Sequence, residues 1–158
     1  MKGNDKVIEY LNEVLKAELT AINQYFLHAE MLSDWGYKKL AAAAKKESID
    51  EMKHAELMIE RILFLDGKPT MNELFPLHIG HDVKTQFEND LALELDAIDR
   101  LNHAIRVAME ANDNGSRELF EQLLTDEEGH ADFLETQLHM MQEMGSGHYL
   151  GRQLDSEA

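Results

Sequence analysis

The chain has 158 residues, of which 44% are hydrophobic, so it is long enough to bury the core of one domain. Its 31 acidic and 15 basic side chains give a formal net charge of −16, which argues against nucleic acid or an anionic membrane surface as a partner. The absence of cysteine excludes disulfides, thiol catalysis and iron–sulfur clusters. We find no secretory signal and no apolar run of membrane-spanning length, so we expect a cytoplasmic protein.

Long stretches rich in Ala, Leu, Glu, Lys and Met predict four long helices. They cover residues 5–34, 39–65, 83–111 and 117–144, and a short helix or tail is expected over 147–158. Apolar residues recur at helical intervals within them, and no segment alternates with the period of a strand, so we predict no sheet. The expected N-caps are Asn4 or Asp5, Asp82, and Asn114 or Ser116. The expected helix stops are Gly36, Gly67 and Gly145.

The connections between these helices differ in length. A few residues join the first helix to the second and the third to the fourth, which makes each pair an antiparallel hairpin. Residues 66–82 join the hairpins and, at roughly 3.3 Å per extended residue, can cross the whole bundle. We therefore predict one all-α domain over residues 1–158, a ferritin-like four-helix bundle with one long crossover and a short C-terminal fifth helix.

The two hairpins carry an internal repeat. Residues 18–22 (ELTAI) match residues 94–98 (ELDAI) at an offset of 76 positions. Residues 50–55 (DEMKHA) match residues 126–131 (DEEGHA) at the same offset. The repeat indicates a pseudo-twofold arrangement with the repeated polar residues near its axis.

The repeated polar residues share helix faces with apolar residues, so they are expected to point inward. Four buried carboxylates would each cost several kcal/mol without compensation, on the order of other buried charges. Two divalent cations would neutralise them, and a lone Glu from each of two helices with Glu-x-x-His from the other two is the di-iron carboxylate pattern. Oxygen and nitrogen ligands suit iron or manganese, with zinc as a competitor. The six predicted ligands are Glu18, Glu51, His54, Glu94, Glu127 and His130.

These ligands suggest a ferroxidase, in which Glu51 and Glu127 bridge two irons. Glu18 and His54 would hold one ion, and Glu94 and His130 the other. Tyr25 lies one heptad beyond Glu18 on the same face. Two interpretations of Tyr25 remain open, a residue that hydrogen-bonds or donates an electron at the site and a core tyrosine with a satisfied hydroxyl.

Met52 points about 100° away from Glu51 and belongs to a second apolar stripe with Ile49, Ile59 and Leu63. A helix that is apolar on two sides needs a second partner, and a twofold copy of the chain would bring two Met52 side chains together. A methionine in such a stripe is ordinarily packing. Two facing thioethers could instead hold a haem iron.

Five segments resemble bacterioferritin sequences, and the resemblance covers the whole chain. They are residues 21–29 (AINQYFLHA), 47–55 (ESIDEMKHA), 60–65 (ERILFL), 90–95 (DLALEL) and 126–130 (DEEGH). In that family the resemblance implies a hollow homo-oligomeric shell of twenty-four subunits that oxidises Fe(II) and stores a ferric mineral. The overall reaction would convert four Fe(II), four protons and one O2 to four Fe(III) and two waters, with H2O2 as an alternative oxidant.

The six predicted ligands match the ferroxidase ligands of that family one by one. Met52 matches its haem-binding methionine, so the resemblance implies a haem b shared by two subunits, which passes electrons inward for iron release, often from a ferredoxin. Asp50 corresponds to a residue of an inner-surface iron site in some members. Those members have histidine where this chain has Lys46, and a protonated lysine is no metal ligand.

Two other functions remain open from the sequence. The first is a haem-binding or structural shell subunit whose di-metal site holds an inert ion such as zinc. The second is a di-iron oxidoreductase that acts on a peroxide or an organic substrate without storing iron. The intact set of six ligands argues against the first, and the sequence shows no substrate pocket for the second.

Overall fold

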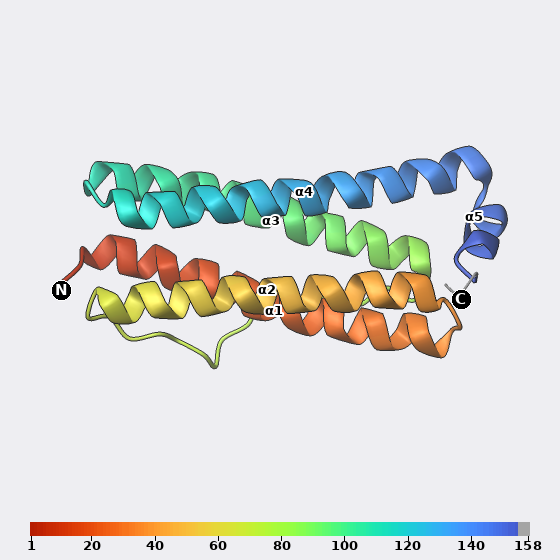
Figure 1. Cartoon of the computed structure of the whole chain (residues 1–158), viewed down its shortest axis with the longest axis horizontal. Helices are drawn as coiled ribbons and strands as arrows, with labels where there is room; N and C mark the ends of the chain where they lie inside the picture. Colours follow the sequence, from red (N-terminus) through yellow and green to blue (C-terminus); the bar gives the residue numbers. More distant parts are fainter. Residues whose placement is uncertain (155–158) are drawn as a thin grey trace.

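The computed structural model describes residues 1–154, which form five helices and no strand. The helices are α1 (Asp5–Asp34), α2 (Lys38–Phe64), α3 (Val83–Glu110), α4 (Asn114–Met144) and α5 (Ser146–Arg152). Figure 1 shows the α1–α2 hairpin lying against the α3–α4 hairpin, with α5 folded across one end. The predicted all-α ferritin-like bundle with a short fifth helix is confirmed. The last part of the predicted C-terminal segment, residues 155–158, lies outside the described residues.

The crossover between α2 and α3, residues 65–82, carries the chain from one end of the bundle to the other (Figure 1). Four side chains on α1 accept hydrogen bonds from backbone N–H groups of the crossover. The pairs are Asn12 with Thr70 at 2.8 Å, Thr20 with Phe75 at 2.9 Å, Gln24 with His78 at 3.1 Å and His28 with Gly80 at 3.0 Å. A helix places residues four positions apart on one face, so one side of α1 fixes the path of the crossover.

Most predicted helix starts agree with the structure. The Asn4 side chain caps α1, and Asp82 forms a capping box with Thr85 at the start of α3. The predicted start of α4 at residue 117 is wrong by three residues. Asp113 is the cap there, because its carboxylate accepts hydrogen bonds from the Ser116 N–H at 3.0 Å and hydroxyl at 2.7 Å.

The predicted helix stops differ in how they act. Gly36 and Gly145 have φ of 94° and 81°, so both use the left-handed backbone that glycine adopts without a steric cost. After α2 the left-handed residue is Asp66, with φ 59°, and not the predicted Gly67. Gly67 is required for another reason, because a Cβ there would lie 2.8 Å from the Ile8 side chain.

The core is divided into two apolar clusters. One lies towards the N-terminal end of α1 and includes Leu11, Met58 and Phe120, and the other lies towards α5 and includes Phe87 and Tyr149. Buried polar side chains fill the layer between the clusters. Within residues 1–154, no helix combines the length and apolar character needed to cross a membrane.

Candidate metal centre

Each long helix contributes one glutamate to the polar layer. Glu18, Glu51, Glu94 and Glu127 come from α1 to α4 in order, and each is at most 2% exposed. His54 and His130 follow Glu51 and Glu127 by three positions, which places each histidine on the same helix face as its glutamate. The structure brings all six predicted ligands together.

The six residues form two groups that share two members. Glu18, Glu51, His54 and Glu127 have ligand atoms within 4.8 Å of one another, and so do Glu51, Glu94, Glu127 and His130. The shared residues are the two that the sequence predicts to bridge two ions. The arrangement is that of two adjacent metal positions with a common pair of carboxylates.

Both histidines direct Nδ1 toward the carboxylates. His54 Nδ1 lies 3.3 Å from Glu127 Oε1 and 3.6 Å from both Glu18 Oε2 and Glu51 Oε1. His130 Nδ1 lies 3.2 Å from Glu51 Oε1 and 3.5 Å from Glu127 Oε1. The imidazole rings are nearly parallel, with centroids 6.4 Å apart.

The opposite nitrogen of each ring faces a carboxylate at the rim of the cluster. His54 Nε2 lies 2.8 Å from Asp126 Oδ2, and His130 Nε2 lies 2.9 Å from Glu47 Oε2. A carboxylate at Nε2 favours the tautomer with the proton there, which leaves the Nδ1 lone pair available to a cation. Each hairpin's histidine is therefore oriented by a carboxylate from the other hairpin.

Burial and mutual repulsion make it difficult to ionise the four glutamates together. Burial raises the pKa of Glu18 and Glu51 well above the ordinary value, and neighbouring carboxylates raise it further. Burial also raises the pKa of Glu94 to about 8 and of Glu127 to about 6. Without a cation, the cluster must therefore hold protons near neutral pH.

The histidines respond in the opposite direction to the same carboxylates. Burial alone would lower the pKa of His54, but the close carboxylates of Glu127 and Glu51 raise it to about 9. The pKa of His130 is also raised, because the close carboxylates of Glu47 and Glu51 outweigh its burial. Histidine protons are one source of positive charge for the cluster, and bound cations are the other.

Seven buried side-chain atoms of the cluster have no hydrogen-bond partner. They are Glu18 Oε2, both oxygens of Glu51, Glu94 Oε2, Glu127 Oε1 and Nδ1 of both histidines. Unpaired buried polar atoms are costly, and here they all face the same small volume. Carboxylate oxygens and imidazole nitrogens without thiolates suit iron, manganese or zinc. The residues present therefore fit a pair of divalent cations.

Tyr25 touches this cluster through its hydroxyl group. The hydroxyl donates a 2.7 Å hydrogen bond to Glu94 Oε1, and the residue is 2% exposed. Burial and the charge of Glu94 raise the pKa of Tyr25 well above its usual range. This hydrogen bond fits both interpretations of Tyr25, a residue that acts at the site and a core tyrosine whose hydroxyl is satisfied.

Met52 and Asp50 lie outside the two overlapping ligand groups. Met52 is 54% exposed on α2, as expected for a residue that leaves the metal face. Asp50 forms a 2.9 Å ion pair with Lys46. Asp50 also lies within a possible metal-binding group with Glu47 and His130.

Two polar features were missed in the sequence. Glu47 has no counterpart in the internal repeat, whereas Asp126 does, since it matches Asp50. The repeat would have paired Asp50 with His130 Nε2, but Glu47 forms that pair. A buried network is the second feature, because Asp90 accepts a hydrogen bond from Gln24 at 2.9 Å and lies 2.9 Å from His28 Nδ1.

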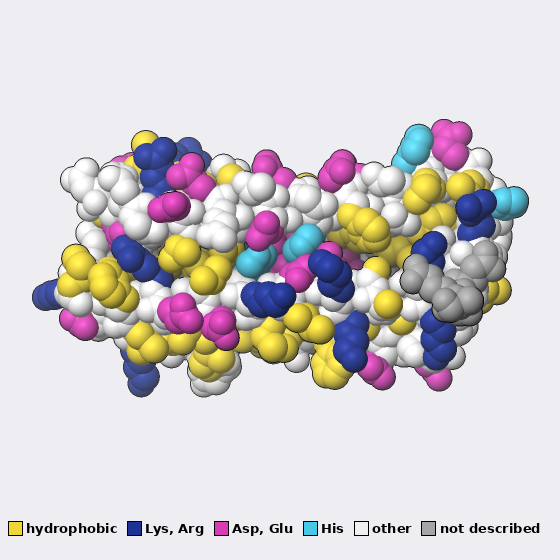
Figure 2. All heavy atoms as spheres, in the orientation of Figure 1, with side chains coloured by type: hydrophobic (Ala, Val, Ile, Leu, Met, Phe, Trp, Pro, Cys, Tyr) yellow, Lys and Arg dark blue, Asp and Glu magenta, His cyan; other side chains and the backbone are white. Residues whose placement is uncertain are grey.

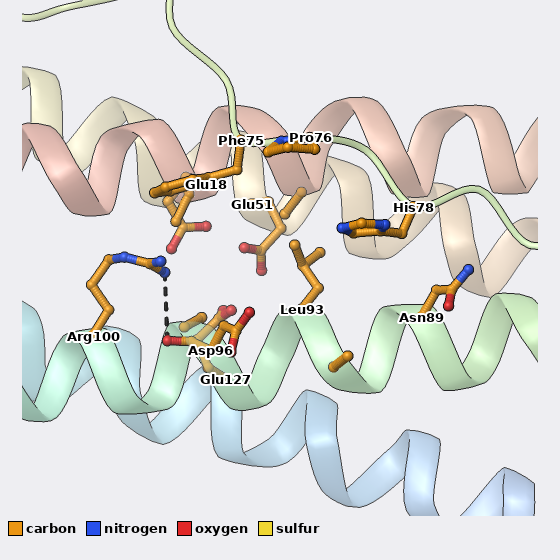
Figure 3. A pocket seen from close by; sticks show the side chains of 14 residues that line it. Glu18, Glu51, Phe75, Pro76, His78, Asn89, Leu93, Asp96, Arg100 and Glu127 are labelled. Carbon is orange, nitrogen blue, oxygen red and sulfur yellow. Dashed lines mark hydrogen bonds between the residues drawn. The ribbon is translucent and has the colours of Figure 1, made fainter.

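A cavity of about 260 Å³ leads to the cluster between the crossover, α1 and α3. Figure 3 shows the carboxylates of Glu18, Glu51 and Glu127 directed into it, with Phe75 and Arg100 near its edge. Arg100 packs over the Phe75 ring at 4.6 Å. Three carboxylates on the walls make this a polar entrance suited to a cation.

Comparison with known proteins gives a consistent result. The ferritin-like domain family matches residues 8–144. A bacterioferritin of Mycolicibacterium paratuberculosis is 50% identical over 145 residues, which cover 92% of this chain and 91% of that protein. Bacterioferritins of Streptomyces coelicolor and Brucella melitensis are 49% and 47% identical, over 95% and 94% of this chain and 90% and 92% of their own lengths.

Proposed function

The chain belongs to the bacterioferritin family, and from this premise we propose that it stores iron after oxidising Fe(II) at the centre formed by Glu18, Glu51, His54, Glu94, Glu127 and His130. The observation that carries the proposal is the pair of overlapping ligand groups that share Glu51 and Glu127. Two Fe(II) ions are the substrate, and O2 or H2O2 accepts their electrons.

In this proposal the ligands bind Fe(II), the rim carboxylates orient the histidines, and the glutamates give up their protons. Fe(II) enters through the polar cavity and displaces the protons that the buried glutamates hold. Asp126 and Glu47 keep the protons of His54 and His130 on Nε2, so that Nδ1 binds the metal. Two adjacent Fe(II) ions supply two electrons together, which avoids the release of a one-electron oxygen radical.

The test is stopped-flow Fe(II) oxidation at two ions per chain. The variant Glu51→Gln should lose the fast phase, because an amide is a poor bridge between two cations. The control Glu60→Gln makes the same change at an exposed position of α2 and should keep the wild-type rate. A fast phase in Glu51→Gln would refute the proposal.

Storage needs a separate measurement from oxidation. Protein loaded aerobically with a large excess of Fe(II) would be passed through a sizing column, and the iron that elutes with it would be assayed. Retention far above two iron atoms per chain supports storage. Retention near two per chain would favour a di-iron enzyme or an inert metal site.

We also propose that Met52 binds haem b at a twofold contact between two copies of the chain. The support is an exposed thioether on α2 beside other exposed apolar residues, Ile49 and Leu63. Haem would supply a one-electron redox group there, which a small ferredoxin could reduce. Met52→Leu should lose the haem absorbance band after reconstitution, while Met71→Leu, which changes a methionine of equal exposure, should retain it.

We propose that twofold dimers of this chain assemble into a cytoplasmic shell of twenty-four subunits. The support is the family and the exposed apolar side chains on α2, which a monomer leaves in water. Sedimentation measures the assembly directly, since the chain has a mass of 18.1 kDa. A monomer or a closed dodecamer would refute this proposal.

A further inference from the structure

A second cavity, of about 20 Å³, lies beside the metal centre between the four long helices. Most of its wall consists of aliphatic and phenylalanine side chains, including Leu40, Phe87 and Leu134. Tyr25 and His130 also line it, and both contact the predicted ligands, Tyr25 through Glu94 and His130 as one of them. The cavity therefore adjoins the centre without using the polar entrance.

The cavity has room for one small molecule. A water molecule needs about 10–15 Å³ and two to four polar partners, whereas apolar cavities remain dry and accept apolar gases. The Tyr25 hydroxyl is already donated to Glu94, Asp90 already accepts from Gln24, and Glu47 Oε2 already faces His130 Nε2 at 2.9 Å. Gln86 Oε1 is a buried acceptor without a partner, and it offers a water one hydrogen bond. An apolar occupant therefore suits this wall better than water.

The two cavities differ in the way that the two substrates of the proposed reaction differ. Fe(II) is a cation, and the larger cavity presents the carboxylates of Glu18, Glu51 and Glu127. O2 is small, apolar and uncharged, so the negative field of the chain neither attracts nor repels it. O2 has a lower free energy in the smaller cavity than in bulk water, because an apolar wall does not have to give up hydrogen bonds to admit it.

We propose that the smaller cavity binds O2 and delivers it to the metal centre between Tyr25 and His130. Phe133 lines the cavity and is 39% exposed, so the cavity lies close to the surface. Figure 2 shows hydrophobic side chains beside histidine and acidic side chains in the groove between α2 and α4. O2 enters from this groove. The inference rests on the proposed ferroxidase function and adds a separate route for the oxidant.

The first test measures binding without any reaction. Xenon is an apolar probe for such cavities, and metal-free crystals would be pressurised with it. Xenon should occupy the cavity in the wild type and in Ala44→Gly, and not in Ala44→Leu, which fills the space from α2. An ordered water or no xenon in the wild type would overturn the proposal.

The second test separates the two oxidants. In Ala44→Leu the O2 concentration that gives half the maximal rate should rise about tenfold, the scale by which one pocket side chain alters small-ligand recognition. Ala44→Gly should show the wild-type value. Oxidation by H2O2 should be unchanged in both variants, since a polar oxidant can use the larger cavity. Leu134→Phe, which fills the cavity from α4, should repeat the result of Ala44→Leu.

The outcomes distinguish this inference from the proposed function. An unchanged O2 dependence in both filled variants, with normal wild-type oxidation, overturns the O2 assignment and leaves the ferroxidase intact. A wild type that oxidises Fe(II) with neither oxidant overturns both. A shift for O2 alone, together with xenon in the cavity, supports the separate route.

Discussion

Replacing Glu94 by glutamine should stabilise the metal-free protein and reduce the stabilisation that bound metal provides. The carboxyl of Glu94 has an ordinary pKa of 4.5 and a pKa of about 8 in the folded protein. Holding it protonated at pH 7 against the value of 4.5 costs about 3 kcal/mol, at about 1.4 kcal/mol per pH unit. Glutamine has no proton to acquire, and its Oε1 can still accept the Tyr25 hydroxyl. Because neighbouring glutamates share the protons, we expect a gain of about 2–3 kcal/mol.

The assay is urea unfolding of chelator-treated protein at one subunit concentration, because assembly contributes to stability. The gain from Glu94→Gln should shrink to under about 1 kcal/mol at pH 5, where the carboxyl is protonated at little cost in either state. Adding Zn(II), which is not oxidised, should stabilise the wild type more than the variant, since an amide is a weaker ligand than a carboxylate. A metal-free variant that is less stable than the wild type at pH 7 would refute the electrostatic reasoning.

Three further predictions concern the rest of the molecule. The metal-free protein should lose stability as the pH rises from about 5 to 9 in thermal melts. Above pH 4.5, the glutamates with raised pKa values destabilise the folded state increasingly. The stabilisation by His54 is complete below pH 6.5 and is lost as the pH passes its folded pKa of about 9. A flat stability profile over this pH range would contradict the prediction. Gln24→Leu strands the His78 N–H and removes a donor to Asp90, so limited proteolysis should cut the crossover faster, and an unchanged rate would show that the crossover does not depend on it. Leu101→Ala, in the fully buried core, should lower the free energy of unfolding measured with urea by about 2–5 kcal/mol. A loss below about 1 kcal/mol would contradict this prediction.

Much of the architecture was predictable because helical periodicity and the internal repeat act over long stretches. The offset of 76 residues between Glu18 and Glu94, and between His54 and His130, is enough to place six side chains in one layer. Helix ends depend on single hydrogen bonds instead. The α4 start at Asn114 follows from the Asp113 carboxylate, a choice among neighbouring polar residues that spacing does not decide.

The environment of the centre was less predictable than its ligands. Glu47 rather than Asp50 pairs with His130 Nε2, because the repeat constrains the residues at the axis and not those at the rim. The smaller cavity depends on how Leu40, Phe87 and Leu134 pack from three different helices. Such a void is a property of three-dimensional packing, and no local pattern in the sequence records it.

The crossed pairing of the histidines has a consequence for how the bundle opens. The helices contact one another mainly within each hairpin, while His54 and His130 reach carboxylates of the opposite hairpin. A cation bound between them ties the hairpins into one cooperative unit, and its loss leaves two units joined chiefly by apolar packing. Amide hydrogens in the middle of α2 and α4 should therefore exchange by separation of the hairpins when metal is absent, and by whole-chain unfolding when it is bound. Metal occupancy would then set how much of the protein unfolds in a single opening event.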